Sequence, residues 1–236
     1  MEFVFGNSEK NYFKKATHKE KQNALVHSFL SRDWQSFSWM LENGISLNNI
    51  TYEILWDAVL RNDASAVKKL IEAGVDVNRV DGIAFREAIR LGNLEIAELL
   101  FNAGADPKVV NNQAMSLAAE LGNTQAITKL CSWGVSAAGW NNDPICRASE
   151  NGHIAAVECL LKHGASLEDA DGNPLTLPIR SAIKNNNQEL GKLIISALDR
   201  DKIIEVLKTL EETSGYLPED WSQRVEYWRL MLSMGS

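Results

Sequence analysis

Histidine is the residue type in this chain whose chemistry most readily supports metal binding or acid–base catalysis. There are four histidines, and they are scattered along the sequence: His18, His27, His153 and His163. A structural or catalytic zinc site needs three or four His, Cys or carboxylate ligands at close spacing. No such cluster accompanies any of these histidines, so we expect no metal site.

Cysteine is the second residue type that could carry chemistry, and there are three: Cys131, Cys146 and Cys159. An odd number without CxxC spacing is typical of reduced thiols. Cys131 and Cys159 fall in apolar helical segments and are expected to be small core residues. Cys146 has no basic residues in a pattern that would activate its thiol, and its exposure is left open.

Phosphate-binding and nucleophilic motifs are also missing from the sequence. Neither GxGxxG nor GxxxxGK[ST] occurs, and no nucleophile stands beside a recognisable base. We therefore expect neither an enzyme nor a cofactor. The alternative of an enzyme whose site lies in residues 199–236 is disfavoured, because 38 residues are too few for an independent active domain.

The overall composition is ordinary for a globular protein, with 45% apolar and 23% charged residues. The formal net charge is −7 and the isoelectric point is about 5.2. This balance argues against a general nucleic-acid or anionic-membrane binder. No long apolar window and no basic stretch followed by an apolar one is present, so we expect a cytoplasmic protein without a membrane anchor or secretory signal.

The elements that carry these residues repeat every 30 positions. One series consists of glycines: Gly44, Gly74, Gly104, Gly134 and Gly164. A second series consists of small residues in the same step: Ser28, Ala58, Ala88, Ala118 and Ala148. Two apolar series keep the same register. Such agreement indicates a repeat protein in which each unit is one supersecondary element.

Each unit predicts two helices separated by a glycine turn. In the third unit, AFREAIRLG has the apolar spacing of a short helix, and LEIAELLFNAG that of a longer amphipathic one. Gly92 and Gly104 stand where each helix ends, a place that favours a left-handed residue. Helices this short cannot cover their own apolar faces, so the units must stack on one another.

The repeated segments resemble ankyrin repeats. GNLEIAELLFNAGADPKV and GHIAAVECLLKHGASLED follow the family pattern, and DPICRA and LPIRSA occupy the place of its TPLHLA segment. The resemblance covers about residues 22–198 and implies an all-α ankyrin-repeat solenoid. It also implies that His153, at the family's Gly-His position, makes a structural hydrogen bond.

The array departs from the family in its connections. Its period is 30 residues rather than 33, so the projecting hairpins are expected to be shortened to tight turns. The junction from Ala148 to Ala182 is four residues longer, and EDADGNPLTLP should form a longer finger. We predict six units: about 22–49, 50–79, 80–109, 110–139, 140–173 and 174–198. Residues 1–21 would be an N-terminal extension or cap, and residues 199–236 a helical C-terminal cap.

The resemblance implies that partners bind to the turn tips and to the exposed side of the first helices, which line a concave face. Carried over by position, the predicted partner-binding residues are Tyr52, Trp56, Leu60, Arg86, Arg90, Glu120, Trp140 and Glu150. Arg180 and Lys184 occupy the same positions in the sixth unit. Tryptophan, tyrosine and arginine dominate binding hot spots. Trp56, Trp140 and the two arginines are expected to lie on one continuous surface. The arginines would pair with acidic groups of the partner.

A competing interpretation gives these residues structural roles only. Trp56 could pack on the next unit, and the asparagines of the tips could serve left-handed turns. The leading hypothesis is a monomeric, non-enzymatic module that binds one or more proteins, as an inhibitor or immunity protein. The alternative is a host-directed viral or bacterial effector or adaptor.

Overall fold

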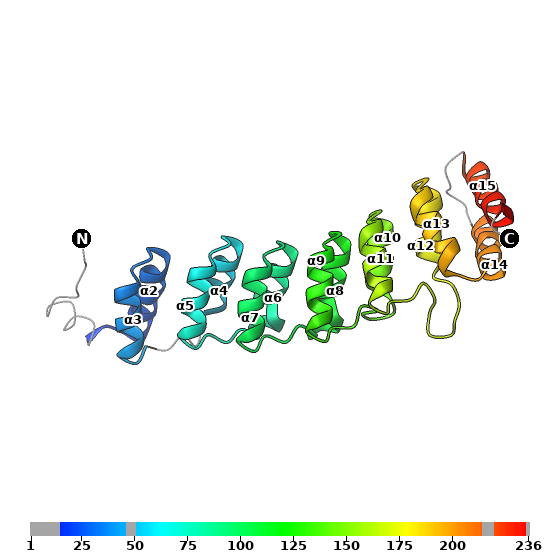
Figure 1. Cartoon of the computed structure of the whole chain (residues 1–236). Coiled ribbons are helices and arrows are strands. Elements are labelled where there is room, and N and C mark those ends of the chain that lie inside the picture. The colour runs from blue at the N-terminus through cyan, green and yellow to red at the C-terminus, as the bar shows by residue number, and fades with distance from the viewer. Residues whose placement is uncertain (1–14, 46–50, 214–219, 235–236) are drawn as a thin grey trace. The chain divides into compact units, whose positions relative to one another are not determined.

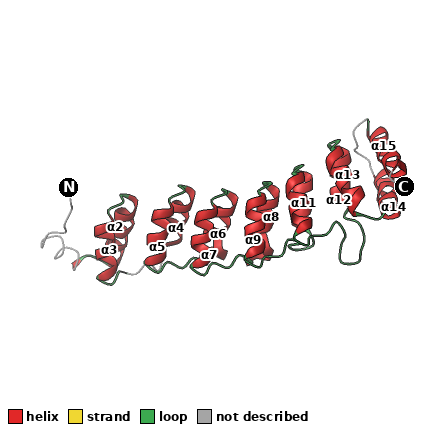
Figure 2. Cartoon of the chain, in the orientation of Figure 1, coloured by secondary structure: helices red, strands yellow, loops and turns green. Residues whose placement is uncertain are grey.

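The fold is known from a computed structural model, which describes residues 15–45, 51–213 and 220–234. The described residues contain fourteen helices and no strand, apart from one isolated antiparallel bridge between Glu168 and Pro174. Figure 2 shows the helices joined by turns and loops, with an extended loop between α11 and α12. The all-α class predicted from the sequence is therefore correct.

The chain divides into two compact units, Met1–Asp106 and Pro107–Ser236. The first unit contains three helix pairs (Figure 1): α2 (His18–Leu30), α3 (Trp34–Glu42), α4 (Thr51–Leu60), α5 (Ala64–Glu72), α6 (Arg79–Arg90) and α7 (Leu94–Asn102). The first helices of successive pairs pack on one another, α2 on α4 and α4 on α6. Each short helix thereby covers its apolar side against a neighbouring pair.

The second unit continues the same pattern and adds two further helices: α8 (Val109–Glu120), α9 (Thr124–Ser132), α10 (Asp143–Glu150), α11 (Ile154–Lys162), α12 (Thr176–Lys184), α13 (Gln188–Ala197), α14 (Arg200–Thr213) and α15 (Trp221–Met234). Helix α10 packs between α8 and α12. Fully buried residues recur at the 30-residue step, for example Met115 with Ile145 and Leu130 with Leu160.

The repeat glycines adopt the left-handed conformation expected of them. Gly104 has φ +93° and Gly134 has φ +80° where their helices end. The turn inside each pair keeps a positive φ even where glycine is replaced, as at Arg32 (φ +59°) and Asn62 (φ +54°). The backbone geometry of the repeat is thus preserved, although the left-handed conformation costs a non-glycine residue conformational free energy.

Asparagines at the turn tips have structural roles: Asn142 adopts the left-handed turn of the competing interpretation, whereas hydrogen bonds between repeats were not predicted. Asn78 donates from Nδ2 to the carbonyl of Gly104 (2.7 Å), and its Oδ1 accepts from the Asp106 amide (2.8 Å). Asn142 has φ +56° and donates to the carbonyl of Glu168 (2.9 Å). These side chains join successive repeats within each unit.

The insertion between α11 and α12 forms the longer finger that the sequence predicts. Asp169 shapes it, because its carboxylate accepts hydrogen bonds from the amides of Asp171 and Asn173, both at 2.9 Å. Lys202 of α14 holds the finger by donating to the Glu168 carboxylate (2.8 Å) and the Gly172 carbonyl (2.6 Å). The finger is therefore tied to the C-terminal helices.

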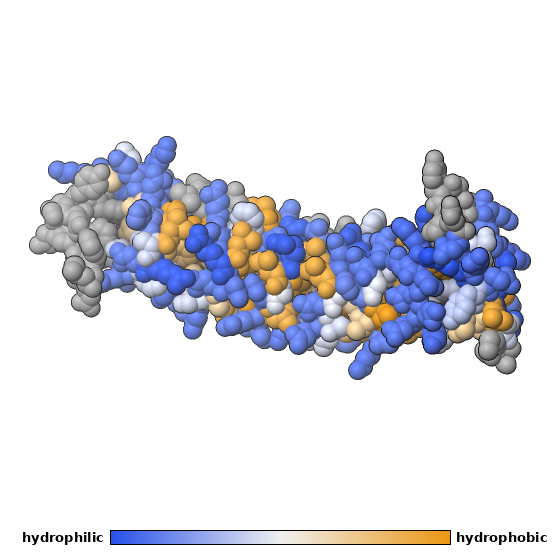
Figure 3. All heavy atoms as spheres, turned by 90° about the horizontal axis from the view of Figure 1, so that it is seen from above, coloured by the Kyte–Doolittle hydropathy of each residue, from blue (hydrophilic) through white to orange (hydrophobic). Residues whose placement is uncertain are grey.

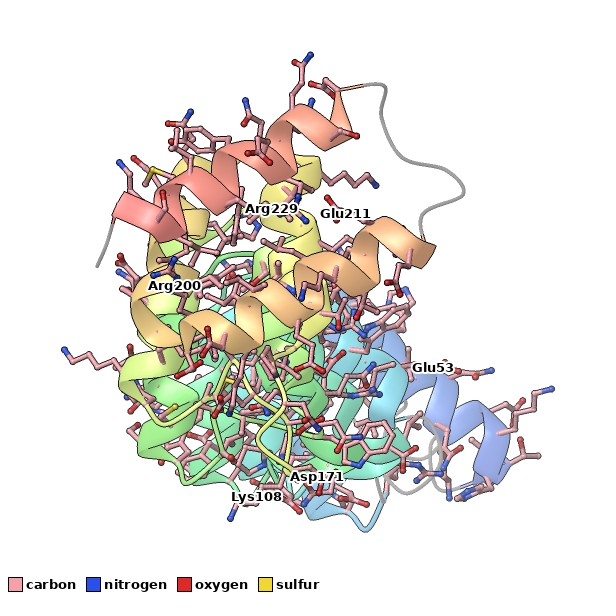
Figure 4. The ribbon with its side chains drawn as sticks, turned by 90° about the vertical axis from the view of Figure 1, so that its right-hand side faces the viewer. Glu53, Lys108, Asp171, Arg200, Glu211 and Arg229 are labelled. Atoms are coloured by element: carbon pink, nitrogen blue, oxygen red, sulfur yellow. The ribbon has the colours of Figure 1, made fainter. Side chains whose placement is uncertain are left out.

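Helix α15 covers the last repeat. Trp228 is only 5% exposed, and a methyl group at Gly191 of α13 would lie 2.9 Å from its ring. Arg224 donates to the carbonyls of Ile183 and Lys184, at the end of α12 where helix carbonyls lack internal partners. Arg229 and Glu211 join α15 to α14 with a salt bridge of 2.7 Å (Figure 4). These contacts are of the kind that a cap would make, and the capping role of residues 199–236 stays a prediction.

His153 makes the structural hydrogen bond expected from the family pattern. Its Nε2 lies 3.0 Å from the carbonyl oxygen of Glu120. The ring also lies against Gly122, where an added Cβ would come within 2.7 Å of it. This contact joins the start of α11 to the end of α8.

Replacing Gly122 by alanine should therefore cost more stability than replacing Gly104 by alanine. Both glycines have positive φ, which costs an L-residue about 1–2 kcal/mol. A Cβ at Gly104 meets nothing within 4 Å, whereas at Gly122 it overlaps His153 and adds an overpacking cost of about 1–3 kcal/mol. Chemical denaturation of the two variants measures the difference. Equal costs would contradict the contact, and adding His153→Ala to Gly122→Ala should remove the extra cost.

Candidate functional site

The predicted partner-binding residues of the first unit lie on α4 and α6. Trp56 and Leu60 are 38% and 41% exposed, and their i, i+4 spacing places them on one side of α4. Arg86 is half-buried and Arg90 is exposed, with the same spacing on α6. Because α4 packs on α6, the structure brings these two pairs onto neighbouring helices.

For this unit, the expected role of Arg90 changes, and the expectations for Tyr52 and for one continuous surface are untested. Arg90 was expected to pair with an acidic group of the binding partner. It already forms a salt bridge within the chain, because its Nε lies 2.7 Å from the Glu87 carboxylate one helical turn away. The Tyr52 side chain lies outside the described residues, and only its backbone is placed, in α4. Trp56 and the arginines belong to one unit and Trp140 to the other. The single continuous surface therefore stays a prediction.

In the second unit the first helices α8, α10 and α12 carry the equivalent positions. Each contributes a pair four residues apart: Ser116 with Glu120, Cys146 with Glu150, and Arg180 with Lys184. The first pair is largely covered, with Ser116 buried and Glu120 half-buried. Glu150, Arg180 and Lys184 are exposed. The packing of α10 between α8 and α12 sets these pairs side by side.

A cavity of about 240 Å³ opens between α8 and α10. Glu120 and Trp140, both predicted from the sequence, line it together with Ser116, Leu117, Asp143 and Arg147. Trp140 is 63% exposed, the highest value among the exposed large apolar residues. Figure 3 shows apolar surface in separate patches among polar side chains. Trp140 thus presents most of its ring to solvent at the edge of this cavity.

Arg147 dominates the electrostatics of this cavity. Its Nε lies 2.7 Å from the Asp143 carboxylate and its Nη1 lies 2.8 Å from that of Glu120. The hydrogen bond to Asp143 is the main cause that raises the pKa of Arg147, and the one to Glu120 adds to it. Two carboxylates and one guanidinium leave the cavity with one net negative charge.

A second cavity, of about 310 Å³, lies between α10 and α12. Glu150 lines it on one side, and Leu177, Arg180, Ser181 and Lys184 line it on the other. Among the described residues, neither the Arg180 guanidinium nor the Lys184 ammonium group has an ion pair or hydrogen bond, whereas the Lys184 backbone carbonyl accepts from Arg224. The nearby Arg224 is neutralised by Asp220 at 2.8 Å. This cavity therefore carries one net positive charge.

Sequence reasoning missed Asp143 and Arg147 as members of the first cavity. Their i, i+4 spacing on α10 was a usable signal for a side-chain pair. The link from Arg147 to Glu120 was not, because it joins residues 27 positions apart in different repeats. Glu120 and Glu150, both predicted to bind the partner, line cavities of opposite net charge.

The cysteines are half-buried rather than buried, which corrects the expectation that Cys131 and Cys159 are core residues. Cys131 lies on the second helix α9, and Cys159 lies on the second helix α11. There Cys159 Sγ lies 3.5 Å from Thr128 Oγ1. Burial is the main cause that raises the pKa of Cys131. Burial, followed by the charges of Asp143 and Glu150, raises the pKa of Cys146 to about 11. The environments of Cys131 and Cys146 therefore disfavour the reactive thiolate.

Cys146 should therefore react slowly with a disulfide reagent such as DTNB. With a pKa of about 11, about one thiol in a thousand is ionised at pH 8, against about one in ten at the ordinary value of 9.0. We expect the Cys131→Ser/Cys159→Ser variant to react about a hundredfold more slowly when folded than when unfolded in guanidinium chloride. Similar rates in the two states would show that the thiol is not shielded.

Within the described ranges, no group of three or more His, Cys, Asp or Glu residues is placed so that it could hold a metal ion. Among the helices that the structure describes, none has the length and apolar character needed to cross a membrane.

The stacked helix pairs define a helical-repeat protein, and comparisons with known proteins show which kind of repeat it contains. Residues 84–171 match the family model for ankyrin repeats, in three copies. A crystal structure of an ankyrin repeat domain from Acinetobacter baumannii is similar, with a TM-score of 0.60 and 28% sequence identity. The similarity covers 73% of this chain and 96% of that domain. A comparison with curated proteins gives no match.

The chain thus contains ankyrin repeats, as its residues suggested. Ankyrin repeats are generally protein–protein interaction modules, and the fold is typically non-enzymatic.

Proposed function

We propose that this protein binds a protein partner through the side of α8 and α10 that carries Trp140. The observation that supports this most directly is the 63% exposure of Trp140 at the edge of a 240 Å³ cavity. Binding hot spots are enriched in tryptophan, and burying this ring would remove a large apolar area from water. A purely structural role does not account for so exposed a ring.

The arrangement around the ring favours a peptide segment or loop as the group that is bound. Leu117 supplies apolar surface, Ser116 a hydroxyl group, and the Glu120–Arg147–Asp143 network a fixed set of polar atoms. Mixed apolar and polar surface of this kind is typical of protein interfaces. The charge of −7 continues to disfavour nucleic acid as the partner.

Panning a random peptide library on the immobilised protein tests this proposal. We expect enriched peptides that bind the wild type and bind Trp140→Ala much more weakly. Trp133→Ala is a matched control, since Trp133 lies at the end of the second helix α9 in the same unit. Peptides that bind all three proteins equally would place the site elsewhere.

The role of an inhibitor or immunity protein is a proposal about the consequence of binding. It predicts that the activity of an isolated partner falls when the wild-type protein is added. The Trp140→Ala variant at the same concentration should leave that activity largely unchanged. A partner whose activity is unchanged in the complex would favour the adaptor or effector alternative. A monomeric state and a cytoplasmic location belong to the same proposal.

A further inference from the structure

Two neighbouring cavities on α8, α10 and α12 carry opposite net charges. Trp140, Glu120 and Asp143 give the first an aromatic and anionic character. Arg180 and Lys184 give the second two cations, opposed only by Glu150. The two cavities share α10, so a single extended segment can reach both.

From this juxtaposition we infer that the bound segment carries a basic and an acidic side chain, spaced Arg-x-x-Glu. The inference rests on the proposed function and specifies the chemistry of the partner. The arginine would stack on the Trp140 ring beside Glu120 and Asp143, and the glutamate would pair with Arg180 and Lys184. Each partner side chain then neutralises the net charge of its cavity.

The chemistry of the first cavity favours a cation. An arginine side chain gains from the face of a tryptophan ring when it lies within about 6 Å of the ring centroid. Arg147 satisfies only part of the hydrogen-bonding capacity of the two carboxylates, since each has further lone pairs. Because the ring and both carboxylates line the same cavity, a guanidinium bound there has an aromatic face and anionic acceptors within the same site.

The chemistry of the second cavity favours a carboxylate rather than a phosphate group. Arg180 and Lys184 lie four residues apart on α12, so both side chains face the same opening. The hydroxyl group of Ser181 lies between them in the sequence and lines the same cavity. Because Glu150 cancels one of the two cations, a monoanion leaves the cavity neutral, whereas a dianionic phosphate leaves it negative.

The spacing of three follows from helix packing. Packed helices lie about 8–10 Å apart. Arg180 aligns with Cys146 in the repeat, three residues beyond Asp143, which adds about 4.5 Å along the helix direction and gives a separation of about 10 Å. An extended chain advances about 3.3 Å per residue, which makes the separation about three residues.

Four display libraries test the inference, each with a fixed Arg and a fixed Glu two, three, four or five positions later and random flanking residues. We expect the strongest enrichment with the spacing of three. The best peptide, made with acetylated and amidated ends, should lose about tenfold or more in affinity for the Arg180→Glu/Lys184→Glu variant. Replacing its Glu by Lys should restore binding to that variant.

The control is Lys162→Glu/Lys192→Glu, which makes the same charge change at exposed lysines of the second helices α11 and α13. It should bind the peptide like the wild type. Equal binding by the Arg180→Glu/Lys184→Glu variant, or no enrichment in any of the four libraries, would overturn the inference. A phosphoserine peptide that binds more than tenfold tighter than its glutamate counterpart would also overturn it. Random-library peptides that need Trp140 but ignore Arg180 and Lys184 would refute only this inference and leave the proposed function standing.

Discussion

Replacing Trp228 by alanine is expected to lower the free energy of unfolding by about 3–5 kcal/mol, the usual cost of removing a buried aromatic side chain. The ring is 5% exposed and lies against Gly191 of α13. Its loss leaves a cavity between the last repeat and α15, since the glycine backbone cannot fill the space. The carbonyls at the end of α12 would also lose Arg224 if α15 came away.

Guanidinium denaturation followed by circular dichroism measures this effect. Leu230→Ala is the matched control, because Leu230 is 55% exposed on the same helix and should change stability by no more than about 0.5 kcal/mol. If Trp228→Ala unfolds at the same denaturant concentration as the wild type, α15 is not a cap. The aromatic residues of α15 would then become candidates for partner binding.

Replacing Trp140 by alanine is the second large expected effect, and it concerns binding rather than folding. Truncation of a hot-spot residue costs about 2 kcal/mol or more, which is about a thirtyfold loss of affinity. Because the ring is mostly exposed, the variant should unfold within about 0.5 kcal/mol of the wild type. Calorimetric titration of a peptide from the random library, paired with a melting curve, separates the two effects.

A smaller loss would still be informative. If Trp140→Ala binds within threefold of the wild type while Trp133→Ala does not, the binding surface lies on the second helices. A large loss of stability in Trp140→Ala would show instead that the exposed ring supports the turn at Asn141 and Asn142.

The sequence was sufficient to predict the repeat backbone. The 30-residue glycine series marks positions where a left-handed residue ends a short helix, and Gly104 and Gly134 adopt that conformation. The four extra residues before Ala182 signalled the longer finger. These features depend on local backbone geometry, which residue type and spacing record directly.

The candidate site was only partly predictable, because it depends on side-chain pairing between repeats. Trp140 and Glu120 were expected at the site, but the sequence does not show that Arg147 holds Glu120 at 2.8 Å. The exposure of Cys131 and Cys159 was not predictable either, and the sequence indicated core residues. A helical period places Cys131 and Cys159 on a face, but not at the edge of that face where they are half-exposed.

Hydrogen–deuterium exchange of the protein with and without a peptide from the random library tests the binding site most directly. The proposed function predicts that binding slows exchange in the turn of residues 139–142 and in α8 and α10, which surround the Trp140 cavity. Exchange in the second helices α9 and α11 should change little. Protection confined to α9 and α11, or to α14 and α15, would contradict the assignment of the site.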